Sequence, residues 1–229
     1  MKSPERNFEQ ELYPFLHDTP HGDRKLNGVL AEVRGSTLQK CRDTVELRGR
    51  LIAEYAETLV EAAEAMAEAF ANGGKLLAFG NGGSATDAQD AAADCLVPPN
   101  ARWRALPALS LVNDTAVLTA LANDVGVENM FSRQVIAYGE QGDIALGIST
   151  SGNSADVVVA LAEARRRGLL TIGLAGYDGG AMARGATLDF CFVARLEYVP
   201  RIQEGHATLW HTLLELTQER LAELAGELA

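Results

Sequence analysis

The chain has 229 residues, with 31 acidic residues against 20 lysines and arginines and a formal net charge of −11. A charge of this sign is repelled by nucleic acids and anionic membranes, which argues against both as general partners. The three cysteines lack Cys-x-x-Cys pairing, and no apolar run approaches the roughly 18 residues that span a bilayer. We therefore expect a cytoplasmic protein with one large domain and no zinc knuckle, disulfide framework or membrane anchor.

The amino-terminal part differs from the rest of the chain. The stretch before Leu26 is polar and is interrupted by three prolines and a glycine, Pro4, Pro14, Pro20 and Gly22. Such a composition predicts an arm that is ordered, if at all, by a neighbouring molecule. We divide the chain into an arm with a first helical segment over residues 1–40 and a domain over residues 41–229.

A long helix is predicted from Thr44 to Asn72. Apolar residues recur there at spacings of three and four, and Gly73-Gly74 forms a helix stop. At about 1.5 Å per residue this helix exceeds roughly 40 Å, more than one face of a small sheet covers. We expect part of it to pack on another subunit. A helix that crosses its own domain with a frayed end is the alternative.

Five apolar runs then alternate with helical patterns. The predicted strands are Leu76–Phe79, Ala108–Val112, Asp143–Ile148, Leu169–Leu174 and Leu188–Val193. The predicted helices between them are Ala85–Val97, Asp114–Leu121 with a continuation to Tyr138, Asp156–Arg167 and a short turn over Gly180–Arg184. Continuous apolar strands are typical of a parallel sheet with helices on both faces. The pattern predicts a three-layer α/β/α fold with a five-stranded, doubly wound parallel sheet, flanked by long amino- and carboxyl-terminal helices. Ligands bind such sheets beyond the carboxyl ends of the strands.

Two small-residue turns lie at that edge. The candidate anion ligands are Asn81, Gly82, Gly83 and Ser84 in the first turn and Ser149, Thr150, Ser151 and Ser154 in the second. A strand that enters a helix through such a turn directs backbone N–H groups and hydroxyls at one point, where the helix dipole favours an anion. Either turn alone is equally consistent with an ordinary strand-to-helix connection. Neither has the Walker A or Gly-x-Gly-x-x-Gly spacing, so we expect a sugar phosphate and no nucleotide.

The order of several motifs resembles the sugar isomerase (SIS) family, specifically its phosphoheptose isomerase branch. The motifs are Gly80–Ser84, Asp87–Gln89, Asn113–Thr115, Ala122–Asp124, Ile148–Ser154, Gly176–Gly180 and Arg201–Glu204, and the similarity runs from about Leu47 to Leu224. The resemblance implies a homotetramer of flavodoxin-like SIS domains with active sites between subunits. It also implies isomerisation of sedoheptulose 7-phosphate to D-glycero-D-manno-heptose 7-phosphate, with zinc in several members.

The resemblance assigns site residues. The first metal-ligand pair of the family, His-x-x-x-Glu, is Asp90 and Asp94 here, and the second pair is Gln203 and His211. Asp94 and His211 are also the implied base and acid. Substrate contacts are implied for Gln203, Asp114 and Thr115. A hard carboxylate in place of imidazole shifts the preference from zinc toward Mg²⁺ or Mn²⁺. The alternative for the two aspartates is a solvated helix face.

Other departures concern the substrate. In the family, the helix continues as Leu-x-Gly-Arg, and the resemblance implies that this arginine faces the substrate. Here Cys95–Pro99 takes its place and has no arginine, so Asn100–Arg104 is a candidate for supplying the positive charge instead. His206, Trp210 and Trp103 are interpreted as packing or rim residues. Three hypotheses remain: a heptose phosphate isomerase, a non-catalytic SIS module that binds a sugar phosphate and regulates a protein partner, and an SIS enzyme of changed specificity. His211 favours the first, and the altered aspartates favour the second.

Overall fold

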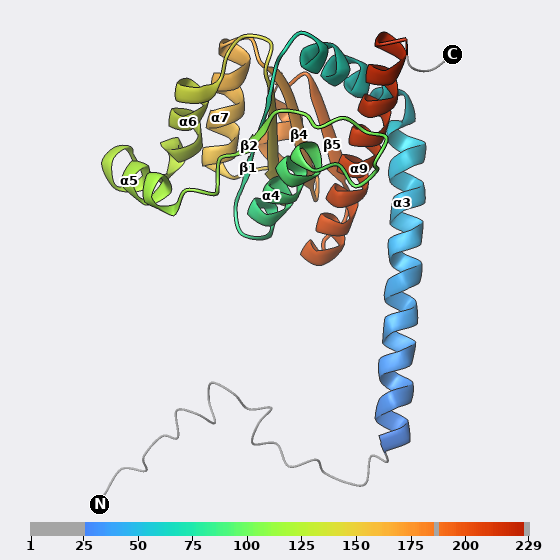
Figure 1. Cartoon of the computed structure of the whole chain (residues 1–229). Helices are drawn as coiled ribbons and strands as arrows, with labels where there is room; N and C mark the ends of the chain where they lie inside the picture. Colours follow the sequence, from blue (N-terminus) through green and yellow to red (C-terminus); the bar gives the residue numbers. More distant parts are fainter. Residues whose placement is uncertain (1–25, 186–187, 227–229) are drawn as a thin grey trace, which may run out of the picture. The chain divides into compact units, whose positions relative to one another are not determined.

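Figure 1 shows the computed structural model, which describes residues 26–185 and 188–226. The predicted amino-terminal arm lies outside the described residues. The chain divides into two compact units, one that ends at Asp43 and one that begins at Thr44. Helix α3 extends over Leu26–Ala71, so it begins well before the predicted Thr44. A Cβ added to either Gly28 or Gly35 would meet no other atom within 4 Å, so these glycines cost helix propensity but serve no tight packing.

The second unit contains the predicted five-stranded parallel sheet, and its strand order is β2-β1-β3-β4-β5. The strands are β1 Leu76–Gly80, β2 Ala108–Ser110, β3 Ile144–Ser149, β4 Leu170–Gly176 and β5 Phe190–Ala194. β2 ends before the predicted Val112, and β5 begins after the predicted Leu188. In register, Leu76 faces Ile144 and Gly80 faces Ile148, which brings the carboxyl ends of β1 and β3 together.

Helices cover both faces of the sheet, so the fold is three-layered (Figure 1). One layer holds α3 from Thr44 on, α4 (Gly83–Leu96) and α9 (Val199–Leu224); the other holds α5 (Thr115–Val125), α6 (Met130–Tyr138), α7 (Ala155–Arg166) and α8 (Gly180–Arg184). Alternate residues of a strand point to opposite faces. Leu76 and Ala78 accordingly pack in the cluster with α3, α4 and α9, whereas Leu77 and Phe79 pack in the cluster with α6 and α7.

The predicted helical continuation after Leu121 is interrupted. α5 ends at Val125, and Gly126 has a positive φ of 90°, which a helix does not accommodate. A short 3₁₀ turn over Val127–Asn129 then leads into α6. Within the described ranges, no helix has both the length and the apolar character needed to cross a membrane.

Candidate functional site

The first turn connects β1 to α4 through glycines that allow close approach. Gly82 has a positive φ of 57°. A Cβ on Gly80 would lie 2.7 Å from the carbonyl oxygen of Ile148, and a Cβ on Gly83 would collide with the Gln203 amide. The turn therefore lies directly beside the end of β3 and beside α9. Ser84, at the start of α4, is buried.

Asn81 is held by a carboxylate that the sequence analysis did not single out. Its Nδ2 donates to both carboxylate oxygens of Asp156, at 3.1 and 2.8 Å. Asp156 is buried in the first turn of α7, immediately after the serine-rich turn, so this contact joins the two turns. The signal that would have found it is an acidic residue at the start of the helix that follows Ser154.

Three hydroxyls of the serine-rich turn lie close to one another. Ser149 Oγ lies 2.9 Å from Ser154 Oγ and 3.4 Å from Ser151 Oγ. Gly152 has a positive φ of 63°, and a Cβ there would collide with the carbonyl of Gly179. The serine-rich turn thus packs against the turn before α8, and three hydroxyls share one small region at the start of α7.

Asp114 and Thr115 lie at the start of α5. Both are exposed, and Asp114 caps α5 by accepting a hydrogen bond of 3.0 Å from the backbone N–H of Val117. Gln89 of α4 donates to Asn113 at 2.8 Å, which ties this loop to α4. The structure therefore gives Asp114 a capping role, and its predicted substrate contact remains a prediction.

Asp94 and His211 face one another across α4 and α9. Asp94 Oδ2 lies 3.6 Å from His211 Nε2, and Trp210 Nε1 donates to the same oxygen at 3.2 Å. The Asp94 side chain is 25 % exposed and that of His211 is 64 % exposed. Together with Trp103 and Asn100 they line a pocket of about 470 Å³. Trp210 was expected to be a packing or rim residue, but its indole also donates a hydrogen bond that orients a carboxylate.

A smaller pocket of about 70 Å³ lies between the same helices and adjoins His211. Asp87 lines it, and burial raises the pKa of that carboxyl to about 6, an effect that Asp90 reinforces and Gln203 opposes. His206 also lines it, and burial lowers the pKa of its imidazole to about 4. Asp87 lies in one of the motifs on which the family resemblance is based. The residues around it in the sequence do not indicate that its carboxyl is buried.

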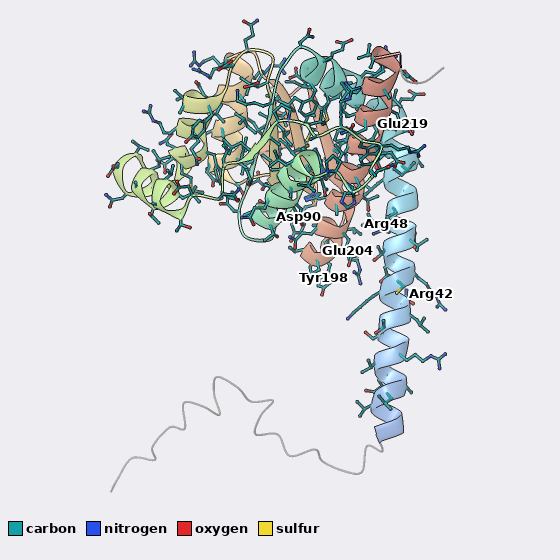
Figure 2. All side chains as sticks on the ribbon, viewed as in Figure 1. Arg42, Arg48, Asp90, Tyr198, Glu204 and Glu219 are labelled. Atoms are coloured by element: carbon teal, nitrogen blue, oxygen red, sulfur yellow. The ribbon has the colours of Figure 1, made fainter. Side chains whose placement is uncertain are left out.

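Of the four donors implied for a metal, Asp94 and His211 are in contact, and Asp90 lines the small pocket beside His211. Asp90 lies exposed on α4 (Figure 2), and Asp94 is already bonded to Trp210. Gln203 lies against Gly83 and Asp87, at the other end of α4. Among the residues that the structure describes, no three His, Cys, Asp or Glu side chains are grouped closely enough to hold a metal ion. The arrangement within one chain therefore does not fit a ready-formed metal centre.

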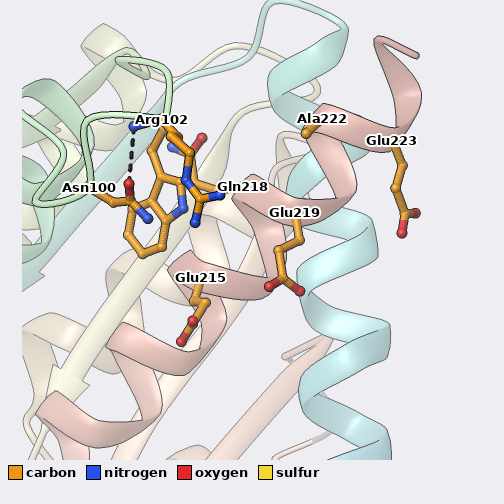
Figure 3. Close-up of a pocket in the computed structure, with 8 residues that line it drawn as sticks. Asn100, Arg102, Glu215, Gln218, Glu219, Ala222 and Glu223 are labelled. Atoms are coloured by element: carbon orange, nitrogen blue, oxygen red, sulfur yellow. Dashed lines mark hydrogen bonds between the residues drawn. The ribbon is translucent and has the colours of Figure 1, made fainter. Parts of the chain in front are cut away.

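Arg102 lies in a loop beside α9. It lines a pocket of about 490 Å³ with three glutamates of α9, Glu215, Glu219 and Glu223. Figure 3 shows these glutamates along α9 and the neighbouring loop, in which the backbone N–H of Arg102 donates to Asn100 Oδ1 at 3.0 Å. The loop is also held on α9 because Gln218 exchanges two hydrogen bonds with the backbone of Arg104. The structure thus places the charge of Arg102 beside carboxylates.

Comparisons with known proteins agree with this geometry. Residues 41–176 match the SIS domain family. The chain is 46% identical over 168 residues to the phosphoheptose isomerase of Geobacter sulfurreducens, covering 73% of this chain and 88% of that protein. It is 43% identical over 182 residues to the phosphoheptose isomerase of Aquifex aeolicus, covering 80% of this chain and 94% of that protein. The solved phosphoheptose isomerase of Neisseria gonorrhoeae is 37% identical, with a TM-score of 0.74 over 82% of this chain and 99% of that one.

Proposed function

Because the chain belongs to the SIS family, in its phosphoheptose isomerase branch, we propose that it interconverts sedoheptulose 7-phosphate and D-glycero-D-manno-heptose 7-phosphate. The observation that carries this proposal is the close approach of Asp94 on α4 and His211 on α9, 3.6 Å apart, in a chain that also gathers three hydroxyls in the serine-rich turn. An isomerase of this kind needs a base, an acid and an anion site, and these residues supply all three.

The serine-rich turn holds the phosphate. The hydroxyls of Ser149, Ser151 and Ser154 donate to its oxygens, and the amino terminus of α7 contributes backbone N–H groups and a favourable dipole. Two basic side chains of the segments that follow β4 and β5 are paired with carboxylates, Arg184 with Asp178 and Arg201 with Glu204. Neutral donors therefore bind the anion.

The carbonyl moves through an ene-diol. Asp94 removes a proton from C1 of the ketose, and His211 donates a proton to the oxygen on C2. Return of a proton to C2 and loss of the proton on O1 then produce the aldehyde, so no atom is gained or lost. The Trp210 indole holds the Asp94 carboxylate in place, and the exposed His211 exchanges protons with solvent.

Solvent exchange tests the proposal. Purified protein is incubated in deuterium oxide with sedoheptulose 7-phosphate, with and without Zn²⁺, Mg²⁺ or Mn²⁺, and deuterium at C1 and C2 is followed by NMR. We expect exchange with the wild type and a rate roughly 10²–10⁴-fold lower with His211→Ala, at nearly unchanged substrate affinity. If neither protein exchanges these protons but both bind the sugar phosphate, the non-catalytic binding module replaces the isomerase.

We further propose a homotetramer with sites completed by a neighbouring subunit. The support is the length of α3, 46 residues, together with exposed apolar side chains on it such as Val45 and Ile52. Light scattering at micromolar concentration measures this directly. A monomer would contradict the assembly and leave the site without its second subunit.

A further inference from the structure

Two residues that line the small pocket between α4 and α9 each have a buried polar atom that no described residue satisfies. They are Oδ2 of Asp87 and Nδ1 of His206. The other residues that line this pocket are Asp90, Ile148, Leu174, Ala207, Trp210 and His211. Buried polar atoms are nearly always hydrogen-bonded, and an unpaired one is destabilising. Two in one pocket point to a ligand that supplies the bonds.

His206, which lines this pocket, has an unpaired acceptor. Its Nε2 lies 2.8 Å from the carbonyl oxygen of Ala175, which can only accept a hydrogen bond. Nε2 therefore carries the ring proton, and Nδ1 has the free lone pair. The side chain is 1 % exposed, so its ring is fixed by packing. The carboxylate oxygen of Asp87 is also an acceptor, so both unpaired atoms require a donor.

The composition of the pocket limits what that donor is. Among the described residues that line it there is no lysine or arginine. The carboxylates of Asp87 and Asp90 repel an anion, which disfavours the phosphate end of a substrate. The volume of about 70 Å³ admits only a few non-hydrogen atoms, since one water occupies roughly 30 Å³. Ile148 and Leu174 add apolar contacts that suit the C–H groups of a sugar.

We propose that Asp87 and His206 form a hydroxyl subsite, which binds hydroxyl groups of the sugar chain next to His211. This inference rests on the proposed function, because it assigns the subsite to the same substrate. The subsite determines specificity, since a sugar that lacks the matching hydroxyl leaves a buried acceptor unpaired. Neither residue moves the substrate protons in this scheme.

Two conservative variants test the subsite. His206→Gln retains a side-chain N–H for the Ala175 carbonyl and removes the Nδ1 acceptor. Asp87→Asn retains the shape and removes the charge. We expect KM for sedoheptulose 7-phosphate to rise about 10-fold in each with kcat nearly unchanged, as for the loss of one hydrogen bond made in both ground and transition states. Glu219→Gln, the same type of change at an exposed position of α9, should leave both constants unchanged.

A panel of monodeoxy sedoheptulose 7-phosphates identifies the bound hydroxyl. We expect the wild type to bind one analogue about 10-fold more weakly than sedoheptulose 7-phosphate itself. We expect His206→Gln or Asp87→Asn to bind that analogue as tightly as it binds sedoheptulose 7-phosphate. The subsite would be overturned by an unchanged KM in Asp87→Asn. It would also be overturned if every analogue lost affinity to the same extent in the wild type and in the variants. If His206→Gln fails to fold, Asp87→Asn decides alone. A wild type without isomerase activity overturns the proposed function instead, and calorimetry with the same panel still decides the subsite.

Discussion

The indole Nε1 of Trp210 donates a hydrogen bond of 3.2 Å to Oδ2 of Asp94. This oxygen is also the one nearest to His211. Trp210 is buried in α9, whereas Asp94 lies on α4, so the contact connects core packing to the proposed acid and base. A buried, rigid donor of this kind restricts where the carboxylate points.

Trp210→Phe is expected to lower kcat roughly 10- to 100-fold, because Asp94 loses the group that orients it. Loss of one hydrogen bond should also reduce the free energy of unfolding by about 0.5–1.5 kcal/mol. Steady-state kinetics and urea unfolding measure the two effects. Leu209→Val is the matched control, since this buried residue of the same helix lies in the core cluster and should cost about 1 kcal/mol of stability with kcat retained. A kcat equal to that of the wild type in Trp210→Phe would remove the orienting role.

Ser151→Ala is expected to weaken sugar-phosphate binding by about 1–3 kcal/mol, because a hydroxyl is lost from the cluster around Ser149. Isothermal titration calorimetry measures the affinity. The fold should be unaffected, since the side chain is only half-buried. Thr119→Ala, which removes an exposed helical hydroxyl on α5, is the control. Unchanged affinity in both Ser151→Ala and Ser154→Ala would exclude the serine-rich turn from the site.

Asp87 and His206 should give the folding stability opposite pH dependences. The pKa of Asp87 is raised by burial from 3.8 to about 6, so its folded form binds an extra proton between these values and stability falls as pH rises. The pKa of His206 is lowered by burial from 6.5 to about 4, so the unfolded form binds the extra proton and stability increases as pH rises. The two effects oppose one another over pH 4–6.

Urea unfolding at intervals across this range separates the two groups. Relative to the wild type, Asp87→Asn should gain stability as pH rises from 4 to 6, and His206→Gln should lose stability as pH rises from 4 to 6.5. Stability curves that run parallel to that of the wild type in both variants would show that neither group titrates differently in the folded and unfolded states.

Restoring the family pair with Asp90→His and Asp94→Glu should increase zinc affinity. The imidazole is a better zinc ligand than a carboxylate, and the longer side chain advances the second carboxylate by roughly 1.3 Å. Calorimetry with Zn²⁺ measures this independently of turnover. The isomerase rate of the double variant then distinguishes two explanations for the aspartates. If they have impaired an isomerase, the double variant is faster than the wild type, whereas if the enzyme is adapted to them, it is slower. Equal zinc affinity in wild type and variant would contradict the prediction.

Much of the framework could be predicted from the sequence because it depends on local chemistry. Apolar runs such as Leu76–Phe79 and Asp143–Ile148 identified buried parallel strands, and glycines such as Gly82 marked turns whose backbone angles other residues resist. The serine cluster followed from the same logic, since neighbouring hydroxyls at one strand end share one region. The full extent of α3 was missed because the helix continues to Leu26 without a clear apolar period.

Which side chains meet across the site was decided only by the packing of α9 and α7 around α4 and β1. Trp210 and Asp94 are 116 positions apart, and Asn81 and Asp156 are 75 apart, so no local pattern relates them. Burial of His206 likewise depends on how α9 meets the end of β4, where the Ala175 carbonyl orients its ring. Hydrogen-bond partners and desolvation arise from contacts distant in sequence, and these contacts form only when the layers close on one another.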